Sequence, residues 1–363
     1  ECLTVMQTIK QKTFWPVFFR IVHFVVQVGA LAAYCAGCKP SKQEREQKDP
    51  RHQLGKGRRL MAQSRYPEAE KALEKAWRGM PGNLDAVRAL ARVQALQGRL
   101  REAANTLNKG LVQHAERGRA AKEVSQRYQT LLELAAVFRR QGKHNEAVDA
   151  LDKARKLQPD RVEALWRMAR LYEQFKKAGV ARTIYKLVAQ KHAGKALEAE
   201  ALLRWARMER RLKKPAEASI LLNKALALKQ GKRKLRAEIQ RDLGNLLLKK
   251  GEKQKAVVHL KKAAAGLDKT SEAGTVNLEL AETLVALDRC TEAQPFLKVA
   301  MERLKRNGRA PFLLARCLLE NSGEAETPSR EKAYRLVQKA HGLDPGDPDI
   351  MFLLARLHLA HDL

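Results

Sequence analysis

From about residue 51 onward, the hydrophobic and polar positions of the chain repeat with a period of roughly 34 residues. The repeated element reads E-A-x-x-x-L-x-K-A. Its clearest copies run over 68–76, 146–154, 217–225 and 332–340. A fixed period of roughly 20 to 50 residues is typical of arrays in which one supersecondary unit stacks on the next. The pattern therefore predicts a stacked array rather than a compact domain with a single core.

Turn signals fall between the predicted helices. Gln141-Gly142-Lys143 and Lys250-Gly251-Glu252 place glycine where a helix can end in the left-handed conformation. Pro81, Pro159 and Pro345 stand at the ends of repeats, where a helix cannot continue. The pattern predicts helix pairs joined by short turns.

Composition agrees with an all-helical chain. Hydrophobic residues make up 45% of the 363 residues and aromatic residues only 5%, and the apolar content is mainly alanine and leucine, which favour helices. Lys and Arg together number 71 against 40 Asp and Glu, for a formal net charge of +31. Such an excess resists compaction into a sphere and attracts acidic partners or polyanions.

Few residues have the spacing of catalytic or metal-binding motifs. The nine His show no zinc-protease spacing, and the chain has no P-loop, dinucleotide fingerprint or nucleophile elbow. The five Cys are too few and too scattered for a disulfide framework, and Cys290 and Cys317 are interpreted as small apolar residues of helix packing. We expect no enzyme activity, no catalytic residues, no cofactor and no metal site.

The amino-terminal segment resembles a bacterial lipoprotein signal. Lys10, Lys12 and Arg20 precede an apolar stretch over 21–34, and Ala36-Gly37 stand before Cys38. In that family the cysteine after a small residue is lipidated, which implies Cys38 here, although Cys35 stands where the family usually has leucine.

Three alternatives for this segment stay open. Residues 14–37 are long enough for an uncleaved membrane anchor, and the basic residues that follow would then keep the repeats in the cytoplasm. Cys35 and Cys38 also have the spacing of a haem or redox site, but Lys39 stands where haem attachment needs histidine. The third alternative is a segment without a targeting role. We expect residues 1–38 to be the signal or anchor and 39–50 to be a charged linker.

The array resembles the tetratricopeptide repeat (TPR), whose helix A carries a large residue followed by Gly or Ala and whose helix B carries two small residues seven positions apart. The helix A pairs are Lys56-Gly57, Leu90-Ala91, Leu134-Ala135, Met168-Ala169, Trp205-Ala206, Leu243-Gly244, Leu280-Ala281 and Leu314-Ala315. The helix B pairs are Ala69/Ala76, Ala103/Gly110, Ala147/Ala154, Ala181/Val188, Ala218/Ala225, Ala256/Ala263, Ala293/Ala300 and Ala333/Ala340. Small side chains at these positions let the helix backbones approach closely, and only Val188 is larger than alanine.

The resemblance implies an all-α, right-handed superhelical solenoid of about eight TPR units over 51–363. The units are predicted near 51–83, 84–127, 128–161, 162–198, 199–236, 237–273, 274–307 and 308–347, with a final helix over 349–360. One step between units is 44 residues long, and we expect residues 111–126 to absorb it as an extended helix B with a longer loop.

In the TPR family, helix A lines the inner face, where extended peptides bind. Of the 48 positions that the eight units offer there, Arg fills 15 and Lys one, although the chain has nearly equal numbers of the two cations. Guanidinium groups suit carboxylates or phosphates because they offer a planar pair of donors. The predicted partner-binding residues are Arg58, Arg88, Arg92, Trp166, Arg167, Arg170, Arg204, Arg207, Arg241 and Arg316.

Two alternative interpretations, ion pairing within the chain and packing in the core, assign no binding role to residues on these helices. The arginines could simply pair with six glutamates that fall on the same face: Glu133, Glu163, Glu173, Glu200, Glu238 and Glu279. Trp205, Tyr172 and Tyr185 sit at packing positions and are expected in the core, whereas Trp166 falls on the inner face.

Two functions follow from these features. The first is a non-enzymatic scaffold for protein–protein interaction that binds an extended acidic partner and is tethered to a membrane. The second is a sequence-nonspecific binder of nucleic acid or another polyanion, which would be strongly salt-dependent. The lipoprotein resemblance places the protein in the bacterial envelope, facing the periplasm. The anchor alternative places the repeats in the cytoplasm at the inner membrane.

Overall fold

A computed structural model describes residues 49–115, 121–228, 232–321 and 327–361. These residues form 17 α-helices and no strand. The predicted amino-terminal segment, including Cys38 and most of the charged linker, lies outside the described residues. No helix in the described part of the chain is both long and apolar enough to cross a bilayer.

The helices alternate between two roles along the chain. The A helices are α3 (Pro50–Ala62), α5 (Leu84–Leu96), α7 (Ala121–Arg140), α9 (Glu163–Gln174), α11 (Ala196–Arg211), α13 (Arg233–Lys249), α15 (Ala273–Val285), α17 (Arg309–Asn321) and α19 (Pro348–His361). The B helices are α4 (Tyr66–Gly79), α6 (Leu100–Ala115), α8 (His144–Leu157), α10 (Ala178–Lys191), α12 (Pro215–Ala227), α14 (Lys253–Leu267), α16 (Cys290–Arg303) and α18 (Thr327–Leu343).

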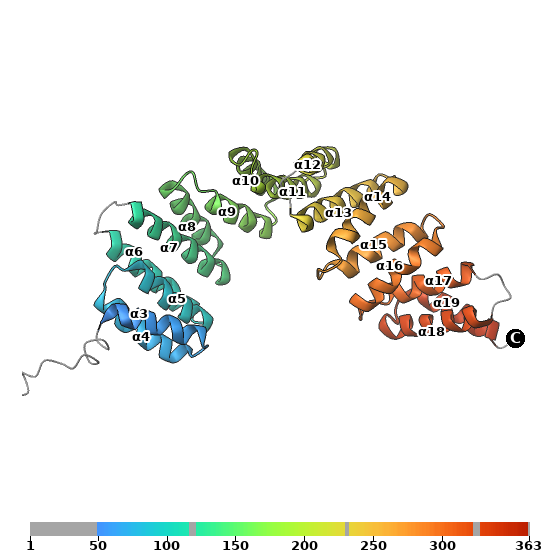
Figure 1. Cartoon of the computed structure of the whole chain (residues 1–363), viewed down its shortest axis with the longest axis horizontal. Helices are drawn as coiled ribbons and strands as arrows, with labels where there is room; N and C mark the ends of the chain where they lie inside the picture. Colours follow the sequence, from blue (N-terminus) through green and yellow to red (C-terminus); the bar gives the residue numbers. More distant parts are fainter. Residues whose placement is uncertain (1–48, 116–120, 229–231, 322–326, 362–363) are drawn as a thin grey trace, which may run out of the picture. The chain divides into compact units, whose positions relative to one another are not determined.

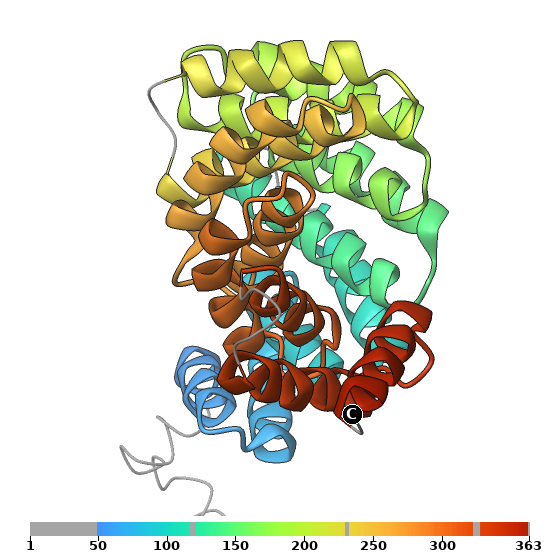
Figure 2. The same ribbon diagram turned by 90° about the vertical axis from the view of Figure 1, so that its right-hand side faces the viewer.

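The chain divides into two compact units at residues 150 and 151. Unit 1 contains α3 to α7 and the first half of α8, and unit 2 continues to α19. From α3 to α7 in unit 1 and from α9 to α19 in unit 2, each helix packs against the next one along the chain, so that A and B helices alternate (Figures 1 and 2). The expected all-α stacking of helix pairs is confirmed.

Small residues at the family positions do bring the helices close together. All of the helix A and helix B positions assigned to small residues are buried, including the larger Val188. The large residues beside them, such as Leu73, Leu107 and Leu260, are fully buried as well. Each pair therefore contributes a layer of buried side chains to its unit.

Two glycines of α3 test this close approach. A Cβ atom on Gly57 would lie 2.5 Å from Cγ of Leu73, whereas a Cβ atom on Gly55 would meet nothing within 4 Å. Alanine is favoured over glycine in a helix by about 1 kcal/mol. We expect Gly55→Ala to raise the free energy of unfolding by about 0.5–1 kcal/mol, and Gly57→Ala to lower it by about 1–2 kcal/mol because Leu73 must move. Urea titration of the two variants checks the opposite signs, and two changes of equal sign would contradict the packing described here.

The turn from helix A to helix B has the same backbone in seven successive repeats. One residue takes a positive φ in each turn: Ser64, Gly98, Gly142, Lys176, Lys213, Gly251 and Asp288. The next residue's N–H donates back to the carbonyl near the end of helix A, as Lys143 does to Phe138 at 2.9 Å. The left-handed helix ending predicted at Gly142 and Gly251 is confirmed, and four non-glycine residues adopt it too.

Two expectations drawn from the sequence differ from the structure. The 44-residue step does not mainly extend helix B: α6 ends at Ala115, while the following helix A, α7, is lengthened and begins at Ala121. Cys290 and Cys317 are not merely small apolar residues, because they form a disulfide between α16 and α17 with their Cα atoms 5.0 Å apart. Both cysteines are buried, so the bond lies inside the core of unit 2.

Candidate partner-binding site

Three of the predicted residues of unit 2, Trp166, Arg170 and Arg204, lie on the A helices α9 and α11, near Tyr185 of α10. The Trp166 ring stands edge-on to the Tyr185 ring with centroids 5.4 Å apart, and Tyr185 is fully buried. The Tyr185 hydroxyl donates to Oε2 of Glu173 at 2.9 Å. Burial and the nearby Glu173 carboxylate raise the pKa of Tyr185, so this hydroxyl stays protonated. Trp166 therefore packs partly against the core.

Glu173, at the end of α9, has more hydrogen-bond donors around it than it binds at hydrogen-bond distance. It accepts from Tyr185, and it forms ion pairs with Arg211 at 3.4 Å and with Arg204 at 3.9 Å. The Arg204 pair is long, and Nε of Arg204 is buried without a hydrogen-bond partner among the described residues. A guanidinium in this state has donor capacity left for a further acceptor.

Arg170 lies one turn from Glu173 on α9 and is exposed. It makes no ion pair with any residue that the structure describes. The positive charges of Arg204 and Arg170 act to lower the pKa of Tyr185, but burial and the Glu173 carboxylate outweigh them. Arg167, in contrast, is paired with Glu163 of its own helix at 2.7 Å.

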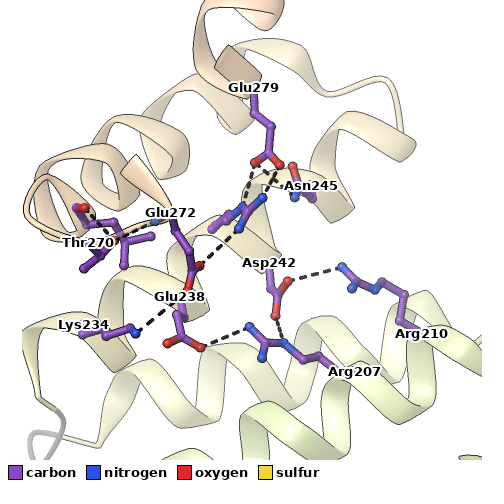
Figure 3. A network of polar contacts seen from close by, with 11 residues as sticks. Arg207, Arg210, Lys234, Glu238, Asp242, Asn245, Thr270, Glu272 and Glu279 are labelled. Atoms are coloured by element: carbon purple, nitrogen blue, oxygen red, sulfur yellow. Dashed lines mark hydrogen bonds and ion pairs between the residues drawn. The ribbon is translucent and has the colours of Figure 1, made fainter. Parts of the chain in front are cut away.

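The arginines of α11 and α13 are instead engaged in a ladder of ion pairs between successive A helices (Figure 3). Arg207 Nε donates to Asp242 Oδ2 at 2.6 Å, and Arg210 contacts the other oxygen of Asp242 at 3.3 Å. Arg207 also contacts Glu238 at 3.3 Å. Burial alone would lower the pKa of Arg207, but the charges and hydrogen bonds of Asp242 and Glu238 more than offset it, and the pKa is raised.

The next rung of the ladder joins α13 to α15. Arg241 Nε donates to Glu279 at 2.9 Å, and Nη1 contacts Glu272 at 3.3 Å. The hydrogen bond with Glu279 raises the pKa of Arg241. Carboxylates from the neighbouring helix thus pair with Arg207, Arg210 and Arg241, as the alternative of ion pairing within the chain predicts.

The other predicted residues are spread along the chain. In unit 1, Arg88 pairs with Asp85, Arg92 pairs with Glu133 of α7, and Arg58 is exposed with no ion pair to a described residue. In unit 2, Arg316 pairs with Glu320 at 2.8 Å on an exposed face of α17. Of the ten predicted residues, Trp166, Arg170 and Arg204 lie near one another, and the two arginines have N–H donors without a close acceptor among the described residues.

Sequence reasoning missed the shared role of Glu173 and the central position of Asp242. The repeat pattern indicates which face of a helix a residue occupies, but not which carboxylate a given arginine reaches. No group of His, Cys, Asp or Glu in the described ranges could hold a metal ion.

Comparison with known proteins agrees with this architecture. Residues 60–127 and 129–171 match two family models, each described as tetratricopeptide repeat. The chain therefore contains tetratricopeptide repeats. Proteins of this class bind proteins or peptides and are generally non-enzymatic scaffolds. No curated protein matches the chain.

Solved structures show the same fold at low sequence identity. The C-terminal part of a TPR repeat-containing protein from Cytophaga hutchinsonii aligns with a TM-score of 0.51 and 10% identity, covering 82% of this chain and 98% of that chain. A structure of the APC/C hetero-tetramer Cut9-Hcn1 aligns with a TM-score of 0.47 and 17% identity over 84% of this chain, which spans 55% of the length of that chain. PilW, a type IV pilus biogenesis factor, aligns with a TM-score of 0.46 and 18% identity, covering 62% of this chain and 98% of PilW.

Proposed function

We propose that the chain is a non-enzymatic scaffold that binds an extended acidic protein segment on the A-helix face of α9 and α11. The observation that carries this proposal is the excess of donors around Glu173. Arg170 has no carboxylate partner among the described residues, and Arg204 has only a distant one and a buried Nε without a hydrogen bond. An incoming carboxylate would meet guanidinium donors that no described carboxylate holds closely, and charge-assisted hydrogen bonds of this kind are strong.

The aromatic residues support the same surface. Trp166 is only partly buried and is held edge-on to Tyr185, so it offers a fixed apolar surface beside the two arginines. Aromatic and arginine side chains together are typical of residues that dominate binding energy. An acidic segment with an apolar side chain next to its carboxylates would match this surface.

Membrane tethering and an envelope location form the second part of the proposal. The segment over 1–38, with Cys38 as the lipidated residue, supplies the tether. The Cys290–Cys317 disulfide supports an oxidising compartment, since disulfides form and persist there and are rare in the cytosol. The repeats would then face the periplasm.

The binding site is tested with the double variant Arg170→Gln and Arg204→Gln in the full chain. Fluorescence anisotropy of a labelled oligo-glutamate peptide should show at least tenfold weaker binding, because two charge-assisted contacts are lost. The matched control is Arg303→Gln with Arg306→Gln, which removes the same charge from exposed positions at the end of α16 and just after it. Equal losses in the two double variants would show that only net charge matters, and this would overturn the proposed site.

A further inference from the structure

The excess positive charge of the chain has to reside somewhere other than the ion-pair ladder. Arg207, Arg210 and Arg241 are matched by Asp242, Glu238, Glu272 and Glu279, so this part of the A-helix face is close to neutral. The whole chain still carries a formal charge of +31. One uncompensated set of cations in unit 2 lies at the turns from helix A to helix B.

Three successive A helices of unit 2, α9, α11 and α13, each have a lysine doublet at or just after their C-terminal end. We call these six lysines the lysine edge: Lys176, Lys177, Lys213, Lys214, Lys249 and Lys250. All six are exposed. Only Lys214 forms an ion pair with a described residue, at 3.8 Å from Glu217. The other five ammonium groups have no carboxylate partner in the described ranges.

The fold brings the turns after α9 and α11 together. Each of these A helices is followed by a B helix that packs against it, so a turn of this kind recurs once per repeat (Figure 1). Arg211 at the end of α11 reaches back to Glu173 at the end of α9, with an ion pair at 3.4 Å and a bond to the Glu173 carbonyl at 3.3 Å. An open hollow of about 840 Å³ between these two turns is lined by Lys176, Lys177 and Arg211.

In two of these turns, a lysine occupies a position whose backbone conformation favours glycine. Lys176 and Lys213 have φ values of 58° and 60°; the corresponding residue is glycine in three of the other turns, at Gly98, Gly142 and Gly251, and Ser64 or Asp288 in the other two. Glycine adopts this conformation without the steric cost that a Cβ atom brings. The charge therefore stands where glycine would give a more stable turn.

We propose that the lysine edge docks on the anionic headgroups of a lipid bilayer. Lysine is a hydrated point charge on a flexible stem, which suits delocalised attraction to an anionic surface rather than bidentate recognition. The six lysines are exposed and, apart from the half-buried Phe175, no aromatic residue stands in these turns to stack a nucleobase. This inference rests on the proposed membrane tether, which would hold the repeats beside a bilayer.

The test separates the lysine edge from the tether. The full chain is mixed at low salt with vesicles of phosphatidylcholine alone or with one-third phosphatidylglycerol, and the bound fraction is measured by co-sedimentation. Binding to the neutral vesicles reports the tether, and the ratio of anionic to neutral binding reports the edge. Each lysine that reaches the headgroups should contribute roughly fivefold to that ratio.

The edge variant carries Lys176→Gly, Lys213→Gly, Lys177→Gln and Lys214→Gln, and its ratio should fall at least tenfold. The control variant carries Lys298→Gln, Lys305→Gln, Lys332→Gln and Lys339→Gln, which removes equal charge from exposed positions elsewhere in unit 2 and should leave most of the ratio intact. A third variant, with Lys176→Gly and Lys213→Gly alone, should melt no lower than the wild type while its ratio falls, which excludes misfolding as the cause.

Two results would overturn the proposal. Equal falls for the edge and control variants would mean that the attraction is diffuse. A fall in binding to a DNA duplex, with unchanged binding to anionic vesicles, would assign the lysine edge to nucleic acid. Loss of binding to neutral vesicles with the ratio retained would count against the tether alone.

Discussion

Replacing Asp242 with alanine is expected to lower the free energy of unfolding by about 3 kcal/mol, because it leaves two arginines of α11 without their shared acceptor. Asp242 is 7% exposed, and the Arg207 side chain that it pairs with is 23% exposed. Removing one partner of a buried ion pair leaves an uncompensated charge and costs about 3–5 kcal/mol. We expect the lower end because Glu238 stays within 3.3 Å of Arg207.

Glu331→Ala is the matched control for this prediction. Glu331 pairs with Arg335 one helical turn away, and both side chains are more than half exposed. Such pairs contribute about 0.3–0.5 kcal/mol. Urea unfolding followed by circular dichroism measures both variants, and similar losses for the two would show that the ladder is not a buried network.

Reduction of the Cys290–Cys317 disulfide is expected to cost about 3 kcal/mol in unit 2. The two cysteines are 27 residues apart, and the bond closes that loop in the unfolded chain. The bond ties a B helix to the A helix of the next repeat, so its loss should loosen the stacking of α16 on α17 in particular. A thermal melt with and without reductant should show a lower melting temperature in the reduced protein.

The double variant Cys290→Ser and Cys317→Ser serves as the control, since its melt should not respond to reductant. Alkylation of the denatured wild type without reductant adds a chemical check. Modification of both Cys290 and Cys317 under these conditions would contradict the disulfide. It would also remove the support that the bond gives to an oxidising compartment.

Much of the fold could be predicted from small residues alone. Each position where the repeat needs Gly or Ala is buried, because the close contact of two helix backbones depends on local side-chain volume. The turns were less predictable. Gly142 and Gly251 indicated a left-handed residue, whereas Ser64, Lys176 and Lys213 take the same conformation without any signal in the residue type.

The candidate site could be predicted only as a face. Arg170, Arg204 and Arg207 were all placed on the A helices, but their different roles depend on carboxylates 31 to 35 residues away in the chain for Arg204 and Arg207. Which arginine reaches which carboxylate is set by the register of one helix against the next, and the repeat pattern does not specify that register. The disulfide escaped prediction for the same reason, because Cys290 and Cys317 belong to neighbouring repeats.

The central claim is that donors left over around Glu173 make the A-helix face of α9 and α11 the place where an acidic segment binds. Photo-crosslinking an oligo-glutamate peptide with a central benzophenone to the full chain, followed by mass spectrometry, tests this claim most directly. The adducts should concentrate on α9 and α11, close to Trp166, Arg170 and Arg204. Adducts spread evenly over the chain, or concentrated on the lysine edge, would contradict it.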